Sequence, residues 1–197
     1  GPPLVREVAL HAVGTLDGEV FLRVLGSSPP EAGSGPMADL ARLAGRRNDS
    51  GSVSEVISSV AGMTNVSRAL AVATALGEGL RQADSSLSTA DRHQQLSALI
   101  KEARRLAAGG TGVGRREALA LLGQLPWAEV RDPLTALLAA TNGEDVQSLG
   151  VRALGGFGDP GAVQALVDSL PGLRPESRRA AVALLLRRLG GTRDLLE

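Results

Sequence analysis

Cysteine is absent from this chain, and aromatic side chains are scarce: its 197 residues include one Trp, two Phe and no Tyr. Without cysteine, the sequence has no disulfide, thiolate metal site, cysteine nucleophile or Cys-x-x-Cys-His site for attaching a c-type haem. Few aromatic rings are available to fill space. We therefore expect a core of Leu, Val and Ala between helices that approach one another closely.

The sequence also lacks an excess of positive or negative charge, and it has no long apolar run. The 21 Lys and Arg side chains balance the 21 Asp and Glu side chains, which gives no indication of binding to nucleic acid or to an anionic membrane. The longest apolar run, residues 180–186, is far shorter than the roughly twenty residues of a membrane helix. The N-terminus lacks a signal-peptide pattern, and residues 1–2 are interpreted as a cloning scar.

The second half of the chain contains a recurring pattern, in which an Arg-bearing apolar helix precedes a second apolar helix. Its three copies open at Gly114, Val146 and Ser177. Self-similarity with a period of about thirty residues is typical of stacked helical hairpins, each of which has an apolar face too small to be buried alone. We therefore predict an all-α fold, an α-solenoid, with a compact helical bundle as the alternative.

Apolar spacing predicts the second helix of each pair, and Gly and Pro mark the helix ends. The two predicted buried stripes are Val130, Leu134, Leu137 and Leu138, followed by Val163, Leu166, Val167 and Leu170. Helix starts are expected at Asp159-Pro160 and Pro175-Glu176, and stops at Asn142-Gly143, Gly155-Gly156 and Pro171-Gly172.

The first half follows the same logic with less regular spacing. Helices are predicted at residues 4–13, 20–25, 37–44, 53–61, 67–81 and about 90–107. Residues 26–36 are expected to form a flexible loop, and residues 109–114 a Gly-rich linker between repeats. We predict a single domain over residues 3–197, with about six helical pairs. Because neither end shows a polar capping helix, we expect the chain to be a fragment of a longer protein.

The Arg-bearing first helices and Leu-rich second helices resemble HEAT-like repeats. The order of segments is also similar to the helical region of large secreted proteins of planctomycetes and related bacteria, which join a dehydrogenase-like β-propeller, a HEAT-like stretch and a C-terminal c-type haem domain. Four segments carry this narrower resemblance: residues 37–47 (MADLARLAGRR), 75–81 (ALGEGLR), 178–188 (RRAAVALLLRR) and 194–197 (DLLE). This chain has no propeller-like strand repeat and no haem-attachment motif, so neither the redox activity nor the haem is carried over.

The resemblance implies a non-catalytic spacer or protein-interaction scaffold, with no cofactor. Its partner would be another protein or the neighbouring domains of a longer bacterial redox protein. The narrower resemblance implies a periplasmic or secreted location, and otherwise a cytoplasmic one is expected. A HEAT-like nucleic-acid binder or DNA glycosylase is the alternative, and a HEAT-like lyase acting on a bound cofactor is a third hypothesis.

Inspection of the chemically reactive residues favours structural roles for each of them. His11 and His93 lack a second ligand at helical spacing, and the absence of a His-Glu dipeptide excludes the iron-binding HEAT-like hydroxylases. Residues 109–114 (GGTGVG) lack the Lys and Ser or Thr of a phosphate-binding loop. No carboxylate pair stands out, and no nearby base activates a serine. The residues considered were Glu117, Glu129, Asp132, Glu144, Asp145, Ser50, Ser52, Ser54, Ser58 and Ser59.

Four arginines of the last repeat, Arg178, Arg179, Arg187 and Arg188, form a candidate nucleic-acid patch. At about 100° per residue they scatter around their helix and do not form a stripe. We expect such arginines to pair with acidic residues of an adjacent hairpin, for which Asp145, Asp159 and Glu176 are available. The sequence therefore predicts no catalytic, cofactor-binding or metal-binding residue.

Overall fold

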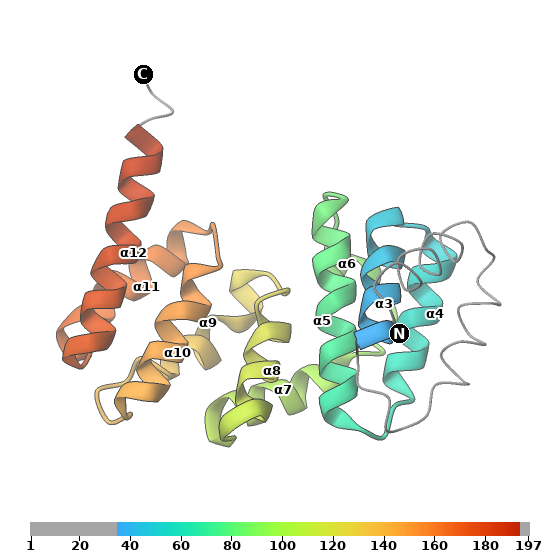
Figure 1. Cartoon of the computed structure of the whole chain (residues 1–197), viewed down its shortest axis with the longest axis horizontal. Coiled ribbons are helices and arrows are strands. Elements are labelled where there is room, and N and C mark those ends of the chain that lie inside the picture. Colours follow the sequence, from blue (N-terminus) through green and yellow to red (C-terminus); the bar gives the residue numbers. More distant parts are fainter. Residues whose placement is uncertain (1–34, 194–197) are drawn as a thin grey trace, which may run out of the picture. The chain divides into compact units, whose positions relative to one another are not determined.

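The structure is a computed structural model that describes the backbone of residues 35–193 and the side chains of residues 35–188 (Figure 1). Within these residues all regular structure is helical, which confirms the predicted all-α class. The helices predicted at residues 4–13 and 20–25, and residues 26–34 of the predicted loop, lie outside the described residues. The chain divides into two compact units, and the boundary in the sequence falls between Ala103 and Arg104. That both belong to one domain stays a prediction.

The described part of the first unit, residues 35–103, contains four helices and the start of a fifth. They are α3 (Gly35–Arg47), α4 (Ser50–Ala61), α5 (Val66–Gln82), α6 (Leu87–Ala90) and the N-terminal part of α7 (Ser97–Gly109). Polar side chains set their starts: the Asp49 side chain accepts a hydrogen bond from the Ser52 N–H, and the Asn65 side chain accepts one from the Arg68 N–H. Each cap satisfies a first-turn N–H group that has no partner within the helix.

The helix predicted from about residue 90 begins at Ser97 in the structure, so this predicted boundary is wrong. The carboxylate of Asp91 accepts hydrogen bonds from the backbone N–H groups of Gln95 and Leu96, at 2.8 Å each. These bonds stabilise a turn before α7, because an Asp side chain competes with the helix for backbone donors. The short α6 precedes this turn and was not predicted.

Helices α3 and α5 cross at two buried glycines, Gly45 and Gly79, and run side by side (Figure 1). A Cβ atom added to Gly45 would lie 2.5 Å from the carbonyl oxygen of Leu76 and 2.7 Å from the backbone nitrogen of Leu80. A Cβ atom on Gly79 would collide with the carbonyl oxygen of Arg42. The two backbones therefore touch where neither helix has a side chain, as the low aromatic content led us to expect.

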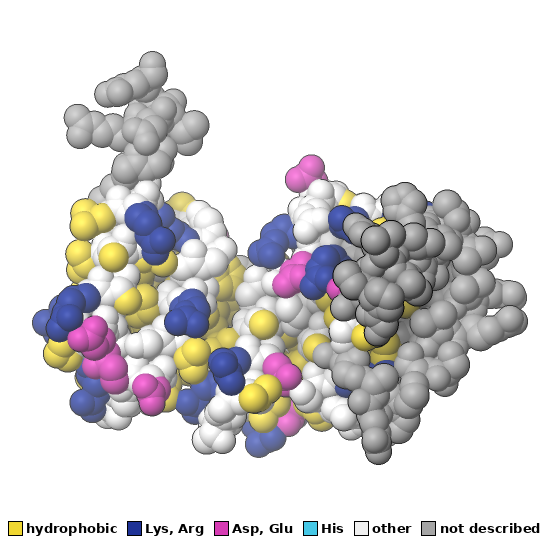
Figure 2. Space-filling model, viewed as in Figure 1, with side chains coloured by type: hydrophobic (Ala, Val, Ile, Leu, Met, Phe, Trp, Pro, Cys, Tyr) yellow, Lys and Arg dark blue, Asp and Glu magenta, His cyan; other side chains and the backbone are white. Residues whose placement is uncertain are grey.

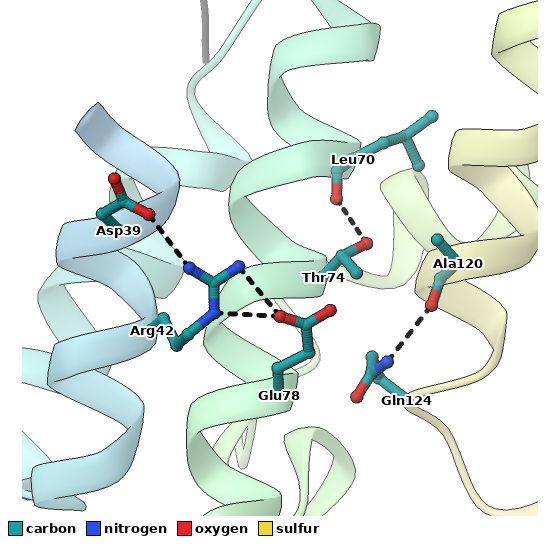
Figure 3. Close-up of polar contacts among 7 residues, drawn as sticks. All are labelled: Asp39, Arg42, Leu70, Thr74, Glu78, Ala120 and Gln124. Atoms are coloured by element: carbon teal, nitrogen blue, oxygen red, sulfur yellow. Dashed lines mark hydrogen bonds and ion pairs between the residues drawn. The ribbon is translucent and has the colours of Figure 1, made fainter. Parts of the chain in front are cut away.

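Arg42 joins the same two helices beside the glycine crossing (Figure 3). Its guanidinium contacts Glu78 on α5 through Nε and Nη2, at 3.0 and 2.9 Å from Oε2. A third nitrogen, Nη1, lies 3.0 Å from Oδ1 of Asp39, one turn earlier on α3. The planar guanidinium thus fixes the rotation of α3 against α5 through several directed bonds.

The second unit is a stack of helical hairpins. It contains the rest of α7, then α8 (Gly112–Leu122), α9 (Trp127–Ala136), α10 (Glu144–Gly155), α11 (Pro160–Ser169), a 3-10 turn at Leu170–Gly172, and α12 (Pro175–Arg193). Helix α10 packs against α8 and α12, whereas α11 packs against α9. First and second helices therefore form two layers, as an α-solenoid requires. Of the predicted linker at residues 109–114, only Gly110 and Thr111 lie between helices.

The buried stripe predicted on α9 is confirmed, and the one on α11 is partly wrong. Val130, Leu134, Leu137 and Leu138 are all buried. On α11, Leu166 is buried, whereas Val167 is 41% exposed. The reason is that Ala162 and Leu166, four residues apart, share the inner face, and the next residue points about 100° away from it.

The two described aromatic rings of this unit contact each other across the hairpins. Trp127 begins α9, and Phe157 follows α10; their ring centroids are 5.5 Å apart in an edge-to-face arrangement. Asp159 caps α11 by accepting a hydrogen bond from the Gly161 N–H at 2.7 Å, and Pro160 occupies the first turn. The helix starts predicted at Asp159-Pro160 and Pro175-Glu176 are therefore confirmed.

Replacing Gly79 by Ala should separate α3 from α5, because the new methyl group meets backbone that cannot rotate away. We expect a loss of about 1–3 kcal/mol in the free energy of unfolding, measured by urea denaturation and circular dichroism. Gly62→Ala is the matched control, since a Cβ atom there would lie at least 3.7 Å from its neighbours. Equal stability of the two variants would show that the helices do not touch at Gly79.

Candidate functional site

The candidate reactive residues do not come together in the described part of the chain. His93 is exposed in the turn before α7, and His11 lies outside the described residues. Over residues 35–188, no group of three or more His, Cys, Asp or Glu side chains could hold a metal ion. Among the described helices, none is long and apolar enough to cross a membrane.

Several of the candidate serines and carboxylates make contacts within the fold. The five serines lie on α4, where Ser52 is bonded to the Asp49 side chain and the Ser58 hydroxyl donates to Oε1 of Gln95 at 3.0 Å. Asp132 pairs with its neighbour Arg131 at 3.1 Å. These interactions are of the kind that caps helices and solvates their outer faces.

Two of the four arginines of the last repeat, Arg178 and Arg188, bind backbone carbonyl groups, partners that the expectation of acidic side chains did not include. Arg178 donates to the carbonyl oxygens of Leu170, Pro171 and Leu173 at 2.9–3.0 Å. Arg188 donates to those of Gly155, the last residue of α10, and of Phe157, two residues beyond it. The last carbonyl groups of a helix have no hydrogen-bond donor within it and carry partial negative charge. A guanidinium supplies both the missing donor and a compensating positive charge.

Acidic side chains account for only part of the expected pairing. Arg179 does pair with Glu176 at 3.0 Å, one turn earlier on α12. Asp159 instead caps α11, and Asp145 is exposed in the first turn of α10. With Arg178 and Arg188 bound to backbone carbonyls, two of the four arginines already have partners that compete with a nucleic-acid phosphate.

Three more arginines of the second unit donate to backbone carbonyl groups. Arg104 binds the Glu129 oxygen at 3.0 Å, Arg115 the Ala108 oxygen at 3.2 Å, and Arg174 the Asn142 oxygen at 3.0 Å. Each bond joins an arginine to a different helix or connection of the unit. Of the arginines that mark the repeat in the sequence, Arg115 and Arg178 therefore join neighbouring elements.

A buried amide lies at the centre of the polar contacts between the last two repeats. Gln147, on α10, is fully buried. Its Nε2 donates to the carbonyl oxygens of Ala139 at 2.9 Å and Gly172 at 3.2 Å, and its Oε1 accepts from the Arg174 N–H at 2.8 Å. One side chain thus satisfies backbone groups of both connections that flank the α10–α11 hairpin. We call this set of contacts the Gln147 junction.

Ser177 and Glu144 form a second polar contact beside the Gln147 junction. Ser177 is fully buried, and both its N–H and its hydroxyl donate to Glu144 Oε1, at 2.6 Å each. The hydroxyl also lies 3.0 Å from that of Ser148. The side-chain hydrogen bond from Ser177 lowers the pKa of Glu144 from its ordinary value of 4.5, and the bond from the Ser177 N–H acts in the same direction. Glu144 is therefore held as a carboxylate at the start of α10.

Sequence reasoning did not identify Gln147 and Ser177 as important residues. Counted from the first residue of each helix, Gln147 on α10 takes the place of Arg115 on α8 and Arg178 on α12. Both of these arginines bind backbone carbonyls. Alignment of the three repeats could have identified Gln147, because the fourth residue of each first helix has a long side chain that donates hydrogen bonds.

Exposed apolar side chains gather on α12. Leu186 is 62% exposed and Val182 is 40% exposed, and Ala183 between them is also exposed. The space-filling view shows hydrophobic side chains interspersed with Lys or Arg side chains over this helix (Figure 2). Exposed apolar groups that lie together are more informative than single ones, because they mark surfaces that other molecules cover.

Comparison with protein families gives a match, which covers most of the second unit. Residues 96–187 match the family of HEAT repeats, a range that contains the hairpins α8–α9 and α10–α11 and much of α12. Comparisons with curated proteins and with solved structures gave no match. The resemblance to HEAT-like repeats is thus confirmed over this range. The narrower resemblance to the helical region of planctomycete-type haem proteins stays a prediction.

Replacing Gln147 by Leu should leave two carbonyl oxygens and one N–H, all partly buried, without the partner that the amide supplies. We expect a loss of about 2–4 kcal/mol in the free energy of unfolding, measured by urea denaturation. Gln164→Leu is the matched control on α11, where the side chain is exposed and bonds only to Asp168; it should change stability by no more than about 0.5 kcal/mol. Similar losses in both variants would contradict a special role for Gln147.

The Glu144 contact should make stability depend on pH in one direction. Because folding lowers the pKa of Glu144, its contribution is fully present above 4.5 and is lost as the pH falls through the lower folded-state pKa. Glu144→Gln should therefore be less stable than the parent chain near neutral pH, and the difference should shrink in acid. Urea denaturation at a series of pH values measures this. Asp145→Asn, which removes the neighbouring charge, is the control and should lose less stability than Glu144→Gln near neutral pH. A stability difference between Glu144→Gln and the parent chain that grows in acid would contradict the assignment.

Proposed function

We propose that the HEAT-like repeats are a non-catalytic module that serves as a spacer or protein-interaction scaffold. The observation that carries this proposal is that the polar side chains of the second unit bind its own backbone, whereas apolar side chains of α12 are exposed. Its buried amide and its carbonyl-binding arginines hold the hairpins together, while apolar side chains remain exposed on α12. Repeat folds commonly bind other proteins through such extended helical surfaces.

We further propose that the module belongs to a larger bacterial redox protein, in which its partners are neighbouring domains. The segments that suggest this lie on α3, α5 and α12 and include residues 37–47, 75–81 and 178–188. The reading frame around this sequence tests the proposal directly. Propeller-like strand repeats upstream and a Cys-x-x-Cys-His motif downstream would support it, and a flanking frame with neither would contradict it.

Affinity capture with the full chain tests the scaffold function. We expect immobilised protein to retain the same partner proteins from a bacterial lysate before and after nuclease digestion, because helical surfaces and not nucleic acid would hold them. Recovery of nucleic acid in place of protein would favour the alternative, a HEAT-like nucleic-acid binder. That alternative also requires binding to duplex DNA that weakens steeply as the salt concentration rises.

A further inference from the structure

The connection between α9 and α10 contains an Asn-Gly step, Asn142-Gly143. In such a step the side-chain amide carbon of Asn can reach the next backbone nitrogen and close a succinimide ring, because glycine has no side chain to hinder the approach. The chain has three asparagines, Asn48, Asn65 and Asn142, and among them only Asn142 precedes a glycine. This connection is therefore the candidate for spontaneous deamidation.

The backbone nitrogen of Gly143 is accessible for the reaction. Gly143 is exposed and lies just before Glu144, the first residue of α10. Within residues 35–188, no hydrogen bond from the Gly143 N–H is found. A Cβ atom added to Gly143 would have nothing within 4 Å. The nitrogen therefore has space around it for ring closure and is not held by a hydrogen-bond acceptor of the described residues.

The side-chain amide of Asn142 binds the C-terminal end of α9. Its Nδ2 donates to the carbonyl oxygen of Ala136, the last residue of α9, at 2.9 Å and to that of Leu137 at 3.0 Å. Asn142 is half-buried. Because Nδ2 is the atom that leaves during ring closure, both hydrogen bonds must break in the reaction. Folding should therefore slow deamidation, although it leaves the two reacting groups next to each other.

We propose that Asn142-Gly143 is a deamidation site of the folded chain. The Gly143 nitrogen gives its proton to hydroxide and attacks Cγ of Asn142. The new N–Cγ bond forms, the Cγ–Nδ2 bond breaks, and Nδ2 takes a proton from water and leaves as ammonia. The proposal does not depend on the scaffold function.

Water then opens the succinimide ring in one of two ways, and the Gly143 nitrogen regains a proton in both. Attack on Cγ breaks the N–Cγ bond and gives aspartate. Attack on the main-chain carbonyl carbon of residue 142 breaks its bond to the Gly143 nitrogen and gives isoaspartate. In isoaspartate the main chain passes through Cβ and Cγ, so the connection between α9 and α10 becomes one atom longer.

Deamidation weakens contacts on both sides of this connection. A carboxylate at residue 142 cannot donate to Ala136 and Leu137, and it places negative charge at the C-terminal end of α9, where the helix dipole disfavours it. The carbonyl oxygen of Asn142 also accepts from Arg174 Nε at 3.0 Å, and in isoaspartate this oxygen belongs to a free carboxylate. Since the Arg174 N–H bonds to Gln147, the change reaches the Gln147 junction.

Peptide mapping of the full chain tests the site. The protein is incubated in mildly alkaline buffer, with circular dichroism to verify that it stays folded. Tryptic peptides are then fragmented in a mass spectrometer, which detects replacement of NH2 by OH at each asparagine. We expect Asn142 to convert about tenfold faster than Asn48 or Asn65, because the side chains of the residues that follow these two crowd the attacking nitrogen. Equal conversion at the three asparagines would overturn the proposal, as would conversion at Asn142 only after unfolding in urea.

Gly143→Ala separates the chemistry from the fold. The φ and ψ angles of Gly143, −69° and 162°, are allowed for any L-residue, and the new Cβ atom meets free space. The variant should therefore keep the circular dichroism spectrum of the parent chain, and its Asn142 should deamidate about tenfold more slowly. Gly62→Ala, also at an exposed glycine, is the matched control and should deamidate at the parent rate. Unchanged deamidation in Gly143→Ala would overturn the proposal.

Asn142→Asp measures the effect of the product on stability. Its carboxylate at the C-terminal end of α9 should lower the urea concentration at the unfolding midpoint. Asn65→Asp is the matched control, because Asn65 caps the N-terminal end of α5, where Asp caps as well as Asn and the helix dipole favours its charge. This control should unfold at the same or a higher urea concentration. An Asn142→Asp variant as stable as the parent chain would overturn the proposed weakening of the connection.

Discussion

The buried amide of Gln147 is the interaction on which the stacking of the last hairpins depends. In the connections between consecutive helices, backbone N–H and C=O groups lack helical partners, and those that Gln147 binds are partly buried. An unsatisfied group of this kind costs about 1–3 kcal/mol. Gln147 satisfies groups of the connections before and after its own hairpin, at Ala139, Gly172 and Arg174. A single side chain therefore couples three consecutive segments of the stack.

Arginine side chains also bind backbone carbonyl groups between elements of the second unit. Arg115 and Arg178 occupy the helix position of Gln147 in the neighbouring repeats, and both donate to carbonyl oxygens. The first unit joins its helices differently, through the close approach of Gly45 and Gly79 and the guanidinium of Arg42. In both units polar side chains act chiefly within the fold, which is consistent with a module that binds other molecules through helical surfaces.

Within the described residues, the sequence predicted most of the helices because their signals are local. The three repeat openings, the Asp159-Pro160 start and the stripe from Val130 to Leu138 follow directly from helical periodicity and capping. The boundary at Ser97 and the exposure of Val167 were missed, since each depends on contacts that periodicity does not encode. The polar partners were missed for the same reason: whether an arginine meets a carboxylate or a helix end depends on how the hairpins pack.

Function is less accessible than fold here, because the candidate reactive side chains of the described residues do not come together. Comparison of equivalent positions in the repeats reveals Gln147, which takes the place of Arg115 and Arg178. In a repeat fold, departures from the repeat are the informative residues, because the shared positions already have a structural explanation.

Hydrogen exchange of the parent chain tests most directly the claim that Gln147 couples consecutive repeats. The N–H group of Arg174 lies in the connection before α12 and that of Ser177 in the first turn of α12, and both donate to side chains of α10. If the account is right, these amides exchange as slowly as those within α10 and show the same dependence on low concentrations of denaturant. Exchange at the rate of an unprotected loop, while α10 remains protected, would contradict it.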